Sequence, residues 1–377
     1  MWRSFLLGIL ALTAYAEDLP RGQIIDDVLC AARSGQRYVL YIPSNYSPQR
    51  AWPVILAFDP RANGRSPVVQ YRVAAETYGF IVAGSKNSRN GPPDVSLNAA
   101  QAMLDDVNSR FSTDPKRIYL AGHSGGARFS MDLAMGTGKF AGVFASSAGF
   151  PREPQKNLPF PVCGTAGTED FNKLGMHTFD RLLTSPHHVA IFDGGHTWLP
   201  SDLAVEAVEW MEVQAMKSGR RGRDDALLNK IFEIRKAKAA AQTDAKSTYL
   251  ALTAIAMDFA GLKDVSEFSK RAAALEQQKD VQDALKKDLA DEQREDRLLK
   301  ELGQLEYVLL DPRERTSALA QLRTRLTDLA HRASTPENTP DRQLARRTIS
   351  ATLADNSGRP DPEFQKLLEE IRPAVRR

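Results

Sequence analysis

The sequence predicts an α/β fold, with a mostly parallel sheet covered by helices on both faces, followed by an all-α region. Two observations carry this prediction. Short apolar runs alternate with amphipathic stretches from residue 37 to residue 217, the pattern of parallel strands joined by crossover helices. Beyond residue 220 only six of the 29 aromatic residues and four of the 24 glycines remain, and 56 of 157 residues are charged. We therefore expect two unlike regions that meet near residue 217.

In the first region the apolar runs are continuous rather than alternating, which indicates strands covered on both faces. Strands are expected at residues 37–42, 53–58, 80–84, 117–121, 141–146, 160–164 and 188–192. Apolar residues at three- and four-residue spacing predict helices at residues 68–78, 98–111, 124–135 and 203–217. In such a sheet the active residues lie at the carboxyl ends of the strands.

Residues 217–377 are predicted to form a charged α-helical domain. Helical stretches are expected at residues 224–241, 248–259, 275–308, 315–332 and 362–371, after a basic, glycine-bearing linker at 217–223. Helix pairs of this kind resemble tetratricopeptide-like arrays, but no clean 34-residue repeat is visible. The broader expectation is a helical module that packs on the first region or docks a protein partner.

Residues 1–16 have the features of a secretory signal peptide. A positive start at Arg3 precedes an apolar core of about ten residues and a small-x-small site at Ala14-Tyr15-Ala16. The sequence therefore predicts export to the periplasm or the exterior, with a catalytic domain over residues 17–216 and no membrane contact after cleavage. An uncleaved membrane anchor is the alternative.

Composition excludes several function classes. A net charge of +3 over 377 residues gives no electrostatic reason to expect nucleic acid as a partner. The two cysteines, Cys30 and Cys163, exclude a disulfide scaffold and a cysteine-based zinc site. In an exported protein they could form one disulfide or stay as two free buried thiols. No motif indicates a cofactor or a metal.

A nucleophile motif stands between a strand and a helix. Residues 122–126 (GHSGG) fit G-x-S-x-G and directly follow the expected strand at 117–121. The turn from strand to helix is so tight that side chains at Gly122 and Gly126 would collide with the backbone. Ser124 is thereby left exposed at a helix N-terminus, where the dipole favours developing negative charge. We predict Ser124 to be a nucleophile.

The serine needs a base, and His196 is the preferred candidate. It follows the last strand, in a loop before the last helix of this region, where the third member of the order serine, acid, histidine is expected. The other five histidines are placed less suitably. His123 lies inside the turn, His177 lies in a helical stretch, His187 and His188 lie at a strand start, and His331 lies in the charged half.

The histidine in turn needs an orienting carboxylate at the end of a strand. Asp170 is preferred, because it lies in the turn-rich segment at 164–170 that follows an apolar strand. Glu169 and Asp193 remain alternatives. For the tetrahedral oxyanion, the backbone N–H of Gly125 is one expected donor. The second is expected in the loop at 59–64, where Arg61 is preferred because Pro60 has no N–H.

Residues 35–216 resemble the α/β-hydrolase superfamily and are most similar to secreted bacterial esterases of the polyhydroxybutyrate-depolymerase and feruloyl-esterase type. The segments IYLAGHSGGA, GTEDFN and FDGGHTWLP carry the resemblance. It implies Ser124, Asp170 and His196 as the triad of a serine carboxylic ester hydrolase. The short loop at 150–159 leaves no room for a large lid, which favours small-molecule or polymer-linked esters. A serine peptidase of the prolyl-oligopeptidase type and a non-catalytic binding protein of the same fold are the alternatives.

Overall fold

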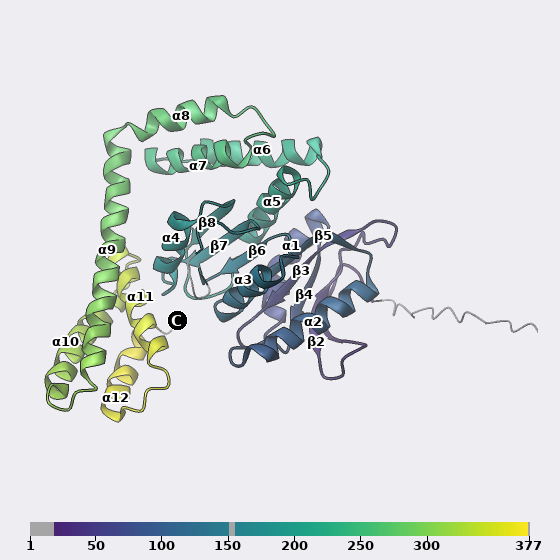
Figure 1. Ribbon diagram of the computed structural model, residues 1–377. Helices are drawn as coiled ribbons and strands as arrows, with labels where there is room; N and C mark the ends of the chain where they lie inside the picture. The colour runs from purple at the N-terminus through teal and green to yellow at the C-terminus, as the bar shows by residue number, and fades with distance from the viewer. Residues whose placement is uncertain (1–18, 151–154, 376–377) are drawn as a thin grey trace, which may run out of the picture.

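The computed structural model describes residues 19–150 and 155–375, so the predicted signal peptide at 1–16 lies outside the described residues. An eight-stranded sheet with the order β1-β2-β4-β3-β5-β6-β7-β8 forms the centre of the first region (Figure 1). The strands are β1 (Ile24–Leu29), β2 (Arg37–Tyr41), β3 (Trp52–Phe58), β4 (Ile81–Ser85), β5 (Thr113–His123), β6 (Val143–Ser146), β7 (Val162–Gly167) and β8 (His187–Phe192). Only the pairings of β2 with β1 and β4 are antiparallel.

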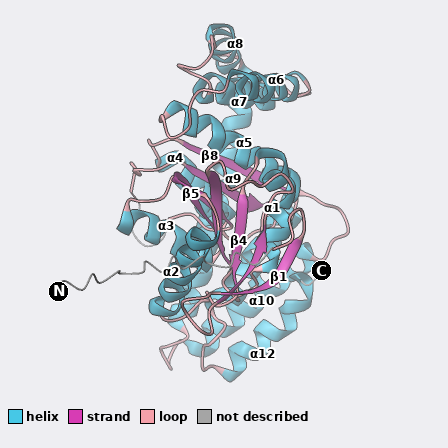
Figure 2. Ribbon diagram, turned by 90° about the vertical axis from the view of Figure 1, so that its right-hand side faces the viewer, coloured by secondary structure: helices cyan, strands magenta, loops and turns pink. Residues whose placement is uncertain are grey.

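Helices cover both faces of this sheet (Figure 2). They are α1 (Arg65–Tyr78), α2 (Pro93–Arg110), α3 (Gly125–Thr137), α4 (Lys173–Leu182) and α5 (Ser201–Lys217). Alternate residues of β3 enter two separate cores: Leu56 packs with α2, α3 and α4 on one face, and Ile55 packs with α1 and α5 on the other. The predicted fold class is confirmed. Strand β1 was not predicted, because it is a half-exposed edge strand whose Asp26 and Asp27 interrupt the apolar pattern.

The two cysteines lie in different cores. Cys30 belongs to the core with α2, α3 and α4, and Cys163 belongs to the core with α1 and α5. Both are free and buried, so the structure has the two free thiols and not the disulfide. Burial raises the pKa of the Cys30 thiol to about 11 and that of Cys163 to about 12, which keeps both thiols protonated and unreactive at neutral pH.

The second region is all-α, as predicted, but the helices at residues 266–276 and 340–355 were not expected from the sequence. Its helices are α6 (Asp225–Ala240), α7 (Ala245–Asp258), α8 (Ser266–Glu276), α9 (Lys279–Val308), α10 (Arg315–Ala333), α11 (Pro340–Asp355) and α12 (Pro362–Ile371), with a final 3-10 turn at Arg372–Val375. The long helix α9 joins α6–α8 at one end to the α10–α12 bundle at the other (Figure 1). Among the described residues no helix is long and apolar enough to cross a membrane.

Helix α5 belongs to both regions. One face of it packs on the sheet, whereas Val213 and Met216 join a core built with α6, α7 and α8. The indole N–H of Trp210 also donates to Asp258 of α7 at 2.7 Å. Glu212 is fully buried and accepts from both Arg117 of β5 and Arg221 of the linker. The junction is therefore packed and hydrogen-bonded rather than a loose hinge.

Replacing Glu212 should destabilise this junction. In Glu212→Leu two largely buried guanidinium groups lose their shared carboxylate, and we expect a loss of about 3 kcal/mol in the free energy of unfolding. Urea denaturation measures this loss. Glu233→Gln, which removes an exposed i,i+3 ion pair with Lys236, should cost less than about 0.5 kcal/mol. Equal unfolding midpoints for the two variants would contradict the role given to Glu212.

Candidate active site

The turn that carries Ser124 is held by close backbone packing. Strand β5 ends at His123, α3 begins at Gly125, and Ser124 between them has φ 54° and ψ −119°. This is a costly conformation for a residue with a side chain, and such strain persists only where the surroundings enforce it. A Cβ at Gly122 would collide with the carbonyl of Gly126, and one at Gly126 would collide with the carbonyl of Phe58. The structure therefore has the predicted strand–turn–helix geometry.

His196 and Asp170 meet above the carboxyl ends of two adjacent strands. Asp170 follows β7, His196 follows β8, and the imidazole Nδ1 lies 2.8 Å from Asp170 Oδ1. Because a carboxylate only accepts, Nδ1–H donates and the acceptor nitrogen is Nε2. Asp170 is fully buried, and its Oδ1 also accepts the backbone N–H of Asn172 at 2.9 Å. The Phe171 ring stacks on the imidazole with centroids 4.2 Å apart, which fixes the ring plane.

His123, inside the turn, packs against the predicted base. Its ring centroid is 4.6 Å from that of His196 and 5.8 Å from that of Trp198. His123 is 3% exposed. Burial, followed by the nearby His196, lowers the pKa of His123 to about 3. It is therefore a neutral ring at neutral pH and supports His196 by packing rather than by charge.

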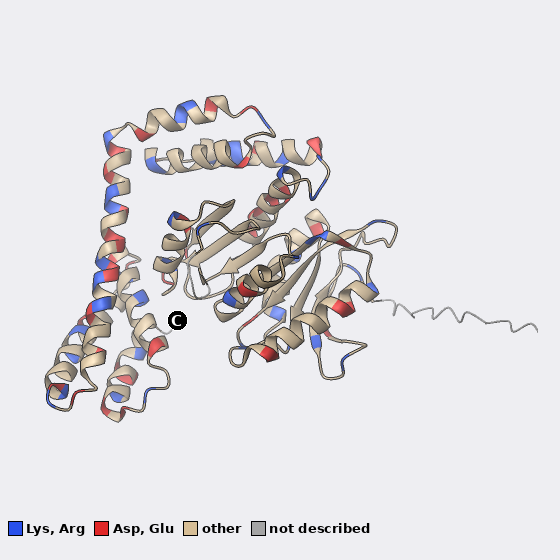
Figure 3. Ribbon diagram, in the orientation of Figure 1, with Lys and Arg blue, Asp and Glu red and all other residues tan. Residues whose placement is uncertain are grey.

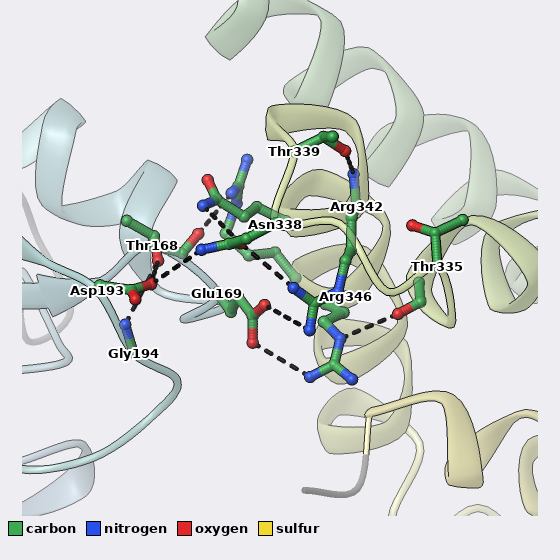
Figure 4. Close-up of polar contacts among 12 residues, drawn as sticks. Thr168, Glu169, Asp193, Gly194, Thr335, Asn338, Thr339, Arg342 and Arg346 are labelled. Carbon is green, nitrogen blue, oxygen red and sulfur yellow. Dashed lines mark hydrogen bonds and ion pairs between the residues drawn. The ribbon is translucent and has the colours of Figure 1, made fainter.

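The alternative acids and bases are engaged elsewhere. Glu169 faces arginines of α11, and Asp193 accepts from the hydroxyl of Thr168 (Figure 4). Among the described residues neither carboxylate is hydrogen-bonded to a histidine. His177 lies beside Glu292, and His187 lies beside Asp180. His188 packs against Trp210, and His331 is exposed in the helical region.

The loop at 59–64 is held by Asp59. This buried carboxylate accepts the Arg61 N–H at 2.9 Å through Oδ1 and the indole N–H of Trp198 at 2.8 Å through Oδ2. The predicted second oxyanion donor is therefore already hydrogen-bonded to its own loop in this conformation. Trp198 is 5% exposed and is a packing residue, not one at the mouth of the site.

A cavity of about 230 Å³ adjoins Gly125, the other predicted donor. It is lined by Asn90, Arg128 and Phe129 among others. The side chain of Asn90 lies so close to Gly125 that a Cβ there would collide with its Oδ1. Sequence analysis missed Asn90, because it lies in the loop after β4, which has no recognisable motif. The cavity adjoins the N-terminus of α3 at Gly125 and Gly126, and Ser124, Asp170 and His196 are not among the residues that line it.

Comparison with known proteins finds similarity to solved structures over about half of the chain. No family model matches the sequence, and a search of curated proteins finds no match. Among solved structures, FphF, a fluorophosphonate-binding serine hydrolase of Staphylococcus aureus, is 15% identical, with 51% of this chain and 99% of that chain covered and a TM-score of 0.40. Est1E from Butyrivibrio proteoclasticus is 15% identical, with coverage of 51% and 98% and a TM-score of 0.39. The feruloyl esterase module from Clostridium thermocellum is 12% identical, with coverage of 52% and 90% and a TM-score of 0.41.

These solved structures are described as a serine hydrolase, an esterase and a feruloyl esterase. They resemble this chain over about half of its length. The residue roles and the substrate proposed below depend on the side chains of this chain.

The glycine requirement at the turn can be tested with two alanine substitutions in one helix. Gly126→Ala should prevent the turn from closing, because its Cβ meets the Phe58 carbonyl. We expect a loss of several kcal/mol in the free energy of unfolding. Gly136→Ala, near the end of α3 with no atom within 4 Å of its Cβ, should be neutral or stabilise by up to about 1 kcal/mol. Thermal unfolding compares the stability of the two variants. If Gly126→Ala is as stable as the wild type, the turn does not require glycine at this position.

Burial of neutral His123 should make stability depend on pH. Its pKa of about 3 in the folded state lies below the ordinary value of 6.5, so the unfolded chain binds the extra proton first as the pH falls. The stabilisation is complete above about pH 6.5 and is lost progressively toward pH 3. Between pH 7 and pH 5 the cost is about 2 kcal/mol. Urea titrations of the wild type and His123→Phe at both pH values should show a loss of stability that is smaller in the variant by about this amount. Other buried histidines, such as His188, whose pKa burial also lowers, contribute equally in both proteins.

Proposed function

We propose that this protein is an exported serine hydrolase that cleaves carboxylic esters through Ser124, His196 and Asp170. The observation that carries the proposal is the hydrogen bond between His196 Nδ1 and the buried Asp170, at the same edge of the sheet as the turn of Ser124. All three residues follow strands whose carboxyl ends point the same way, β5, β7 and β8. The signal-peptide pattern at residues 1–16 supports export.

The proposed reaction proceeds in two acyl-transfer steps. His196 Nε2 removes the hydroxyl proton as Ser124 Oγ bonds to the ester carbonyl carbon, and Asp170 stabilises the imidazolium. The Gly125 N–H and the N-terminus of α3 stabilise the negative charge on the carbonyl oxygen. His196 then donates its proton to the alcohol oxygen, the C–O bond breaks, and the acyl group remains on Ser124. Water, deprotonated by His196, releases the acid and restores the serine.

The cavity beside Gly125 suits a short acyl group better than a long chain. It is small and open to solvent, and residues 155–159 continue directly into β7 without an added domain. We expect short-chain p-nitrophenyl esters to be cleaved faster than the palmitate ester, and peptide p-nitroanilides to be cleaved poorly. Initial rates across this panel test the specificity. Faster turnover of the anilides would favour the prolyl-oligopeptidase alternative.

A fluorophosphonate probe tests the nucleophile directly. The wild type should be labelled at Ser124, and intact-mass and peptide mass spectrometry locate the adduct. Ser124→Ala should remain unlabelled and lose at least about 10⁴-fold in kcat, with a similar loss for His196→Ala. His331→Ala, an exposed histidine of α10, is the matched control and should keep full activity. If the well-folded wild type is not labelled, the protein is not a serine hydrolase. If Ser124→Ala still turns over esters, Ser124 is not the nucleophile.

A further inference from the structure

Three arginines of one helix in the charged region face the loop that carries Asp170 (the Asp170 loop, residues 167–172). Two of them hold Glu169: Arg346 donates to it at 3.2 Å, and the guanidinium of Arg342 lies 3.6 Å from its other oxygen (Figure 4). Glu169 is 6% exposed. The carboxylate next to the predicted catalytic acid is therefore neutralised from the helical region.

The third arginine, Arg347, makes a directional bond to the loop backbone. Its Nε and Nη2 form a two-point pair with Glu295 of α9, at 2.8 and 2.5 Å. Its remaining nitrogen, Nη1, donates to the carbonyl oxygen of Thr168 at 2.6 Å. Arg347 and Glu295 are 6% and 3% exposed. The guanidinium thus joins two helices of the charged region to a point two residues before Asp170.

The opposite side of the Asp170 loop is bonded to the loop that carries His196. The backbone N–H groups of Thr168 and Glu169 donate to the carbonyls of Phe192 and Gly194, each at 2.8 Å. The amide of Asn338, just before α11, contacts Asp193 at 3.5 Å. The separation between Asp170 and His196 therefore depends on a loop fixed from both sides, by the sheet edge and by α11.

A buried ion pair is a poor means of gaining stability, because apolar residues of similar volume often serve as well. The fork of Arg347 adds what apolar residues cannot, namely a charged donor of fixed direction aimed at one backbone carbonyl. From this geometry we propose that Arg347, held by Glu295, is a positioning residue for Asp170. On this proposal the helical region contributes to the active site by positioning Asp170. This inference rests on the proposed function of Asp170 and His196.

The test removes the directed bond without leaving a buried charge. Arg347→Met combined with Glu295→Met takes away both charges and keeps apolar volume between α9 and α11. We expect the double variant to remain folded by circular dichroism and to lose roughly 10- to 100-fold in kcat, with KM unchanged. Hydrogen exchange should show faster exchange in the Asp170 loop and unchanged protection in β3 and β5.

The matched control is Arg315→Met with Asp361→Asn, in the α10–α12 bundle. Arg315 also makes a two-point pair, with Asp361, through Nη1 and Nη2 at 2.6 and 2.7 Å. Its side chain is 29% exposed, and an asparagine can still cap α12. This control should keep the wild-type kcat. Wild-type kcat and loop exchange in the Arg347/Glu295 variant would overturn the positioning role. Equal losses in the variant and the control would overturn it too, because they would indicate a general effect on the helical region. If the wild type itself fails to react with a fluorophosphonate, the proposed function falls, and the catalytic role of Arg347 with it.

Discussion

The constraint on which the rest of the site depends is the contact between backbones at the Ser124 turn. Gly122 lies against Gly126, and Gly126 lies against Phe58 at the end of β3. These contacts press the first turn of α3 onto two neighbouring strands and force Ser124 into a positive φ. Once the serine is fixed there, the loops after β3, β7 and β8 must gather around it, since the carboxyl ends of parallel strands share one edge.

Burial of charge is the second constraint, and the structure meets it in part with hydrogen bonds, since among the described residues Asp170 Oδ2 is buried without a partner. Asp170 is fully buried beside its histidine, and Asp59 is buried below the loop opposite. Each accepts from a backbone N–H and from a ring N–H, so each carboxylate holds a loop and a ring together. His123 adds volume at the centre without adding charge. The polar groups of the site are thus set in well-packed surroundings, where oriented dipoles act more strongly than in water.

The parts of the site that could be predicted from the sequence are those fixed by local sterics. The turn at Ser124 depends on glycines within two residues of it, and His196 and Asp170 follow apolar runs that any strand pattern identifies. Arg61 was the preferred second oxyanion donor, but its backbone N–H already donates to the side chain of Asp59 within the same loop. Strand β1 was missed because one of its faces is in water. The arginines of α11 gave no signal, since their partners lie 177 and 179 residues away.

The charge of the helical region has two different uses. Along α9, Lys and Arg are interspersed with Asp and Glu (Figure 3), and pairs such as Lys300 with Asp296 are exposed. Such pairs contribute little to stability and mainly keep the helices in solvent. Arg347 and Glu295 are the same residue types placed where the region meets the sheet, and there they are almost fully buried. Amino-acid composition does not distinguish exposed from buried charged side chains. An even charge balance therefore gives no sign of the few ions whose burial costs free energy. The two regions are already joined by the apolar packing of α5. The buried ion pair beside the predicted catalytic acid therefore serves to orient the Asp170 loop rather than to hold the regions together.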